Sequence, residues 1–136
     1  MLENFFIFWI FIILLGAFIV LIPKMHYRRK ISKQKNRKYI KKINEILKKR
    51  ISLREKIITF DKILHNILLD LGYTWTLWEI LKKEPEYIAF NIEKIWELHK
   101  LRNTLVHNID EEFSDNFLFL KVGEYYKILK ILLKDI

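Results

Sequence analysis

The run from Phe5 to Ile22 constrains this chain more than any other feature of its sequence. It reads FFIFWIFIILLGAFIVLI and contains no charged residue. At about 1.5 Å per residue, a helix of this length covers roughly 27 Å, close to the hydrocarbon thickness of a bilayer. Inside such a layer only a helix satisfies its own backbone hydrogen bonds. The run therefore predicts one N-terminal transmembrane helix, within an anchor of residues 1–23.

Three other interpretations of this run fit less well. A cleaved signal peptide needs a basic start and a small-x-small cleavage site, whereas this chain begins with the acid Glu3 and the run ends at Pro23-Lys24. A buried core helix is rarely apolar on every face, and an interfacial helix needs a polar face. The sequence favours an uncleaved, single-pass membrane anchor.

The charge that follows the apolar run predicts its orientation. Between residues 24 and 50 there are 13 Lys or Arg and one acid, Glu45. Basic residues beside a membrane helix remain on the cytoplasmic side. We therefore expect a protein of the cytoplasmic (inner) membrane, with its N-terminus outside and its C-terminal domain in the cytoplasm.

Residues 24–50 predict a basic juxtamembrane stalk. Ile40, Ile43, Leu47 and Ile51 recur at helical spacing, so much of this segment should be helical. Near an anionic leaflet each basic residue contributes about 1 kcal/mol, which predicts binding to lipid headgroups. The same charge suits the phosphates of RNA, and both roles remain open. The predicted lipid- or RNA-binding residues are Arg28, Arg29, Lys30, Lys33, Lys35, Arg37 and Lys38.

The remaining residues, 51–136, predict one all-α domain. Gly and Pro number only 3 and 2 in the whole chain, and β-branched residues do not alternate with polar ones. Helical periodicity and capping residues place four helices, whose short connections predict an antiparallel bundle. No Cys is present and the four His lack the spacing of metal ligands, so we expect no metal and no cofactor. The expected helices are 53–71, 76–84, 91–107 and 114–134.

The third expected helix carries polar residues on an apolar face. At about 100° per residue, His99, Arg102 and Asn103 share an arc with Ile95 and other apolar side chains. Polar groups that face other helices are costly unless they have partners. One interpretation is structural. Arg102 would pair with a nearby acid, and His107 would help to cap the end of the helix, where the helix dipole favours a cation. The other is functional.

The segment Leu98-His99-Lys100-Leu101-Arg102-Asn103-Thr104-Leu105-Val106-His107 supports the functional interpretation. Its second half resembles the R-N-x-x-x-H signature of the HEPN superfamily, and it falls near the end of the third helix, where that family carries the signature. The resemblance implies a four-helix domain that dimerises through its third and fourth helices. The apolar residues expected to supply this surface on the fourth helix are Phe117, Leu120, Tyr125, Leu129 and Leu132. The resemblance also implies a metal-independent endoribonuclease or an RNA-binding module.

The resemblance assigns three site residues. His107 would act as the base toward the 2′-hydroxyl of RNA, because imidazole titrates near neutral pH. The planar guanidinium of Arg102 would stabilise the phosphorane oxygens. Asn103 would orient the phosphate or the imidazole. We expect His99 to be a buried, hydrogen-bonded core residue, so that its mutation should affect stability more than chemistry.

The predicted fold class is therefore all-α, with one N-terminal transmembrane helix, a basic helical stalk and an antiparallel four-helix HEPN-like bundle. The predicted function is a membrane-tethered, dimeric HEPN-like endoribonuclease or RNA-binding module. A first alternative is a non-catalytic HEPN-like homodimer that acts as an interaction module at the membrane. A second, without the resemblance, is a basic anchored adaptor whose stalk binds anionic lipid.

Overall fold

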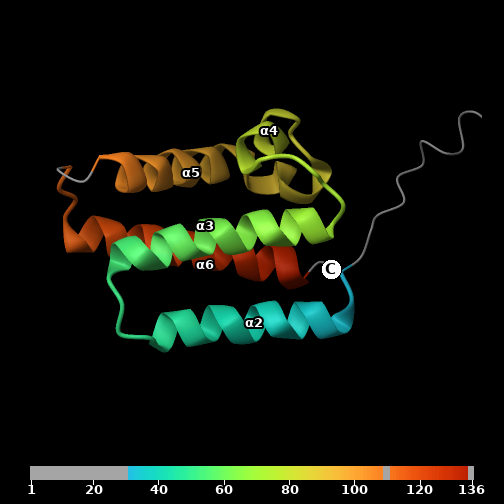
Figure 1. Cartoon of the computed structure of the whole chain (residues 1–136), viewed down its shortest axis with the longest axis horizontal. Helices are drawn as coiled ribbons and strands as arrows, with labels where there is room; N and C mark the ends of the chain where they lie inside the picture. Colours follow the sequence, from blue (N-terminus) through green and yellow to red (C-terminus); the bar gives the residue numbers. More distant parts are fainter. Residues whose placement is uncertain (1–30, 109–110, 135–136) are drawn as a thin grey trace, which may run out of the picture.

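The computed structural model describes residues 31–108 and 111–134, and all regular structure within these two ranges is helical (Figure 1). Four long helices are joined by short connections, and a short helix and a 3-10 helix lie between the second and third of them. The elements are α2 (Lys33–Lys48), α3 (Leu53–Asp70), α4 (Leu77–Lys82), η2 (Glu86–Asn91), α5 (Ile92–His107) and α6 (Asp115–Lys134).

Local side-chain chemistry explains where several helices begin and end. Ser52 and Thr76 each form a capping box. The hydroxyl accepts a hydrogen bond from the backbone N–H three residues later, and the Glu side chain at that later position accepts one from the backbone N–H of the Ser or Thr. Gly72 follows α3 with φ 101°, a left-handed conformation that suits glycine. Asn91, at the start of α5, makes no side-chain capping bond, and η2 runs directly into α5.

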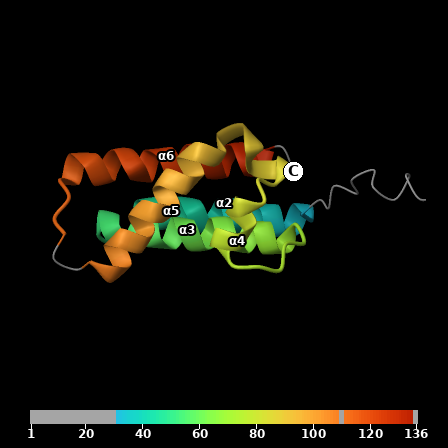
Figure 2. The same cartoon turned by 90° about the horizontal axis from the view of Figure 1, so that it is seen from above.

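The long helices surround one continuous apolar core. In Figure 1 α3 and α6 lie between α5 and α2, and Figure 2 shows α5 crossing obliquely. The most extensive helix pairing is between α3 and α6. The start of α2 meets the end of α6, where Asn36 donates to the carbonyl oxygen of Leu133 at 2.8 Å, so these two helices are antiparallel. The largest fully buried side chains include Phe60, Leu64, Ile80, Leu98 and Tyr125.

The structure corrects the predicted stalk. Helix α2 packs against both α3 and α6, and its side chains Ile43 and Ile46 are buried at 2% and 8% exposure. The apolar row in this segment therefore belongs to the domain core, although basic residues surround it. The fourth long helix of the bundle is α2 and not the segment 76–84, of which only six residues form a helix.

The membrane part of the predicted fold class is not supported by the described residues. None of the helices formed by residues 31–108 and 111–134 is both long and apolar enough to span a bilayer. Even α6, with 20 residues, carries a polar outer face that includes Lys127 and Lys130. The anchor predicted at 1–23 lies outside the described residues. The structure supports an all-α bundle for the part of the chain that it describes.

Candidate functional site

A carboxylate lies inside the bundle, on α3. Asp61 is only 4% exposed, and its neighbours along the same helix, Ile57, Phe60 and Leu64, are fully buried. Its Oδ1 accepts a hydrogen bond of 2.8 Å from the Tyr125 hydroxyl on α6 and lies 2.9 Å from Nδ1 of His99 on α5. One acid thus joins three helices.

The network continues through Arg102 and Asn103 toward the surface. Arg102 Nε lies 3.5 Å from Asp61 Oδ2, and its Nη1 donates to Asn103 Oδ1 at 2.9 Å. Asn103 Nδ2 lies 3.4 Å from His99 Nε2. The Arg102 side chain remains 28% exposed, so it forms the border between network and solvent. We refer to Asp61, His99, Arg102, Asn103 and Tyr125 as the Asp61 cluster.

The protonation of Tyr125 follows from its position. Burial raises the pKa of its phenol well above 10.0, and the neighbouring negative charge and hydrogen bond of Asp61 raise it further. The phenol therefore stays neutral and donates to the carboxylate. A buried carboxylate is costly unless charged or hydrogen-bonding partners compensate it. Tyr125, His99 and Arg102 supply that compensation.

Helical spacing explains why three members of the cluster come from α5. His99, Arg102 and Asn103 are three and four residues apart, so they project from one face of the helix. Leu98, Leu101 and Leu105 adjoin this face and hold it against the core at 9% exposure or less. The apolar stripe therefore fixes the direction in which the polar residues point.

The structure brings together some predicted site residues and separates another. Arg102 and Asn103 are in direct contact through their side chains. His107 is exposed at the end of α5, and within the described residues it has no hydrogen-bond partner. His107 comes five positions after Arg102 in the helix, which corresponds to a rotation of about 140°. The prediction that His99 is a buried, hydrogen-bonded residue is confirmed.

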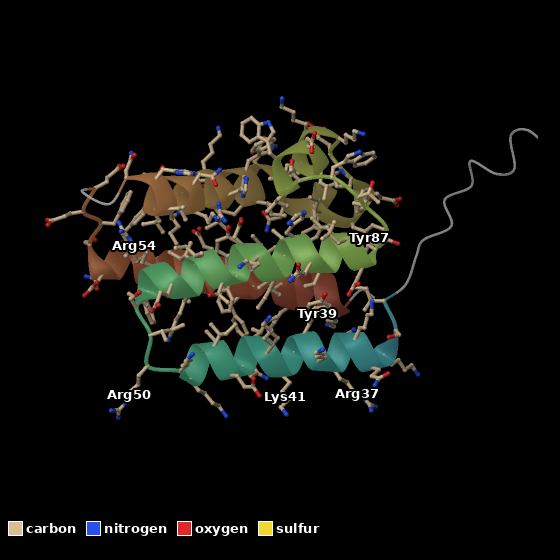
Figure 3. The ribbon with its side chains drawn as sticks, in the orientation of Figure 1. Arg37, Tyr39, Lys41, Arg50, Arg54 and Tyr87 are labelled. Atoms are coloured by element: carbon tan, nitrogen blue, oxygen red, sulfur yellow. The ribbon has the colours of Figure 1, made fainter. Side chains whose placement is uncertain are left out.

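The predicted basic binding residues divide into two groups. Arg28, Arg29 and Lys30 lie outside the described residues. The others are exposed along α2, where Figure 3 shows Arg37 and Lys41 pointing away from the rest of the bundle. Lys35 is engaged, because its Nζ donates to Asp70 on α3 at 2.7 Å. The exposed residues of the predicted set are Lys33, Lys35, Arg37 and Lys38.

Sequence reasoning missed Asp61 and Tyr125. The available signal was the position of Asp61 within a stripe of Ile57, Phe60 and Leu64, where a lone acid faces the core. Such an acid requires a cationic or hydrogen-bonding partner. The partner could not be identified because His99 is 38 residues away in the sequence.

The apolar surface predicted on α6 for dimer formation is partly wrong. Tyr125, Leu129 and Leu132 face the core of their own chain, with exposures of 0%, 0% and 2%. Leu120, also predicted, is 64% exposed, and its neighbour Phe119 is 68% exposed. A dimer therefore stays a prediction, with a different set of residues available to it.

Comparison with protein-family models, curated proteins and solved structures finds no match. The HEPN resemblance thus depends on the ten-residue segment and the helix order. Within residues 31–108 and 111–134, no three His, Asp or Glu side chains are grouped as a metal site.

Proposed function

We propose that this chain is a HEPN-like domain that binds RNA and cleaves it without a metal ion, through Arg102, Asn103 and His107. The proposal rests on the contacts and the exposure of the Arg102 side chain. Asp61 and Asn103 hold its guanidinium at two points, at 3.5 and 2.9 Å, while the side chain stays 28% exposed. A cation that is oriented in advance and accessible to solvent suits a phosphate.

The chemistry needs a proton acceptor in addition to this cation. His107 is exposed and can accept the proton of a 2′-hydroxyl as its oxygen attacks the adjacent phosphorus. The displaced 5′-oxygen takes up a proton, and a cyclic phosphate remains on the other fragment. Because His107 and Arg102 leave α5 about 140° apart, a cleft between two copies suits them better than one copy alone.

The experiment is RNA cleavage by the full-length chain in the presence of a chelator. His107→Ala and Arg102→Ala should each lower the cleavage rate roughly a hundredfold or more, the scale for losing such a group. Glu93→Gln changes an exposed residue of the same helix and serves as the control. The proposal is wrong if the parent protein cleaves no RNA, or if both variants cleave at the parent rate.

A structural role of Arg102 can be separated from a catalytic one. Arg102→Ala removes a partner of buried Asp61 and will lower stability. Arg102→Lys keeps the positive charge but loses the planar fork. His107→Ala should leave the melting temperature unchanged, because His107 is exposed. Loss of cleavage by His107→Ala at unchanged melting temperature distinguishes chemistry from folding.

The exposed apolar residues of α6 favour a second candidate function, that of a non-catalytic homodimeric interaction module. Phe119 and Leu120 adjoin Gly123, at which an added Cβ would meet no atom within 4 Å. A double change to Asp at 119 and 120 should convert a dimer of the full-length chain to a monomer in light scattering. Leu69→Asp, at a 40% exposed apolar site on α3, should leave it dimeric. A parent that is monomeric at tens of micromolar excludes both the dimer and the composite cleft.

A further inference from the structure

A groove of about 740 Å³ runs between α2 and α6, and none of its lining residues belongs to the Asp61 cluster. Its apolar lining includes Ile40 and Ile43 from α2 and Ile131 and Leu133 from α6. Ile40 and Ile131 are 45% and 41% exposed. Apolar area left in water on both walls gains free energy when another apolar surface covers it.

Positive charge accompanies this apolar lining. Lys127, Lys130 and Lys134 line the groove on the α6 side. A shallower hollow continues over α2 and shares Ile40 with the groove. Among the described residues, the only acid that lines either hollow is Glu45, whose Oε1 lies 3.9 Å from Nζ of Lys41. The cations of the second hollow are Arg37, Lys41 and Lys48.

Charge follows the length of the two hollows and is not concentrated at one end. Lys127 and Lys134 are seven residues apart, or about 10.5 Å along α6. Arg37 and Lys48 are separated by about 16 Å along α2. We propose that the α2/α6 groove binds an acidic amphipathic helix of a partner protein. Such a helix presents apolar residues every three or four positions, with acids on its flanks.

Other binding partners would contact less of this surface than an acidic helix would. A single lipid carries its negative charge in one headgroup and would leave most of these cations unpaired. A flat membrane surface does not enter a groove that lies between two helices. A second copy of the groove would bring like charges together, which is unfavourable. An acidic helix covers the isoleucines and meets cations along both walls.

The test measures binding of a labelled peptide to the full-length chain in a non-ionic detergent by fluorescence anisotropy. The probe is a 15-residue helical peptide with Leu at helical spacing and Glu on both flanks, a length of about 22 Å. One control peptide has the same composition with the Leu positions scrambled, and another has Lys in place of Glu. The parent protein should bind the first peptide and neither control.

Two sets of variants locate the binding. Changing Lys127, Lys130 and Lys134 together to Glu should weaken peptide binding about tenfold or more, because three attractive pairs become repulsive. A matched set, Lys42→Glu, Lys49→Glu and Lys62→Glu, makes the same change in net charge at exposed positions that do not line the groove. It should alter binding less than about twofold. Ile131→Asp should also weaken binding, and circular dichroism checks that each variant remains helical.

Three results would overturn the proposal. The first is equal binding of the acidic and scrambled peptides. The second is equal weakening by the two sets of lysine variants, which would mean that binding depends on overall charge. In the third, the parent ignores the peptide but binds phosphatidylserine vesicles or a second copy of itself through Lys127, Lys130 and Lys134; the groove would then serve a membrane or a dimer.

Discussion

Two carboxylates of α3, nine residues apart, have similar partners in different surroundings. Asp61 accepts from the Tyr125 hydroxyl at 2.8 Å and lies beside the cation Arg102. Asp70 accepts from the Tyr39 hydroxyl at 2.8 Å and from Lys35. The side chain of Asp61 is 6% exposed, whereas that of Asp70 is 24% exposed.

The difference in burial decides what each acid can do. Removing one member of a buried ion pair strands a charge and costs several kcal/mol, whereas an exposed pair contributes about 0–1 kcal/mol. Asp61 therefore specifies how α3, α5 and α6 meet and how Arg102 is directed. Asp70 attaches α2 to the end of α3, where water competes for its charge. A carboxylate with a tyrosine and a cation as partners thus orients a candidate site at Asp61, whereas at Asp70 it attaches α2 to α3.

The largest expected effect comes from Asp61. Asp61→Ala leaves the buried Tyr125 hydroxyl and His99 without their acceptor and should lower the free energy of unfolding by about 3 kcal/mol. Urea denaturation followed by circular dichroism measures this change. Asp61→Asn retains an acceptor oxygen and should cost less. A loss below about 1 kcal/mol for Asp61→Ala would remove the contrast with Asp70.

The two tyrosines give an intermediate comparison. Tyr125→Phe removes the hydrogen bond to Asp61 from a fully buried site, and the loss should be about 1.5 kcal/mol. Tyr39→Phe removes the equivalent bond to Asp70 in a partly buried site and should cost about half as much. The same denaturation measurement ranks them. Equal losses would mean that burial does not separate these two bonds.

The smallest effect is expected at Asp70 and depends on pH. The hydrogen bond from Lys35 holds the pKa of Asp70 below its usual 3.8, and the one from Tyr39 acts in the same direction. A carboxyl whose pKa is lower in the folded state stabilises the fold above its unfolded pKa, and this contribution is lost as pH falls through the folded pKa. Asp70→Asn should thus cost only about 0.5 kcal/mol at pH 7. The difference between Asp70→Asn and the parent should shrink in acid, and an unchanged difference at pH 2 would contradict this linkage.

Helix α2 shows where prediction from sequence succeeds and fails. The spacing of Ile40, Ile43 and Leu47 predicts a helix, and the structure has one at Lys33–Lys48. Its basic surroundings suggested a stalk separate from the bundle, whereas Ile43 is buried in the core. Periodicity identifies the apolar side of a helix, but it does not say which surface covers that side. The position of α2 depends on contacts with α6, about ninety residues later, such as Asn36 to Leu133.

What the sequence determined by itself is local. The capping boxes at Ser52 and Thr76 and the end of α3 before Gly72 act within a few residues, so they can be found without the fold. The exposed basic character of α2 and the grouping of Arg102 with Asn103 are local in the same sense.

Tertiary structure alone decided which partners the polar residues have. Asp61 meets His99 and Tyr125 across 38 and 64 residues of chain, and Arg102 is oriented by the same carboxylate. The groove between α2 and α6 likewise exists only after the two helices pack. These features follow from the burial of apolar stripes, and the whole bundle decides which stripes pair. The hydrophobic effect is proportional to the apolar area that is buried and does not depend on which helix supplies that area.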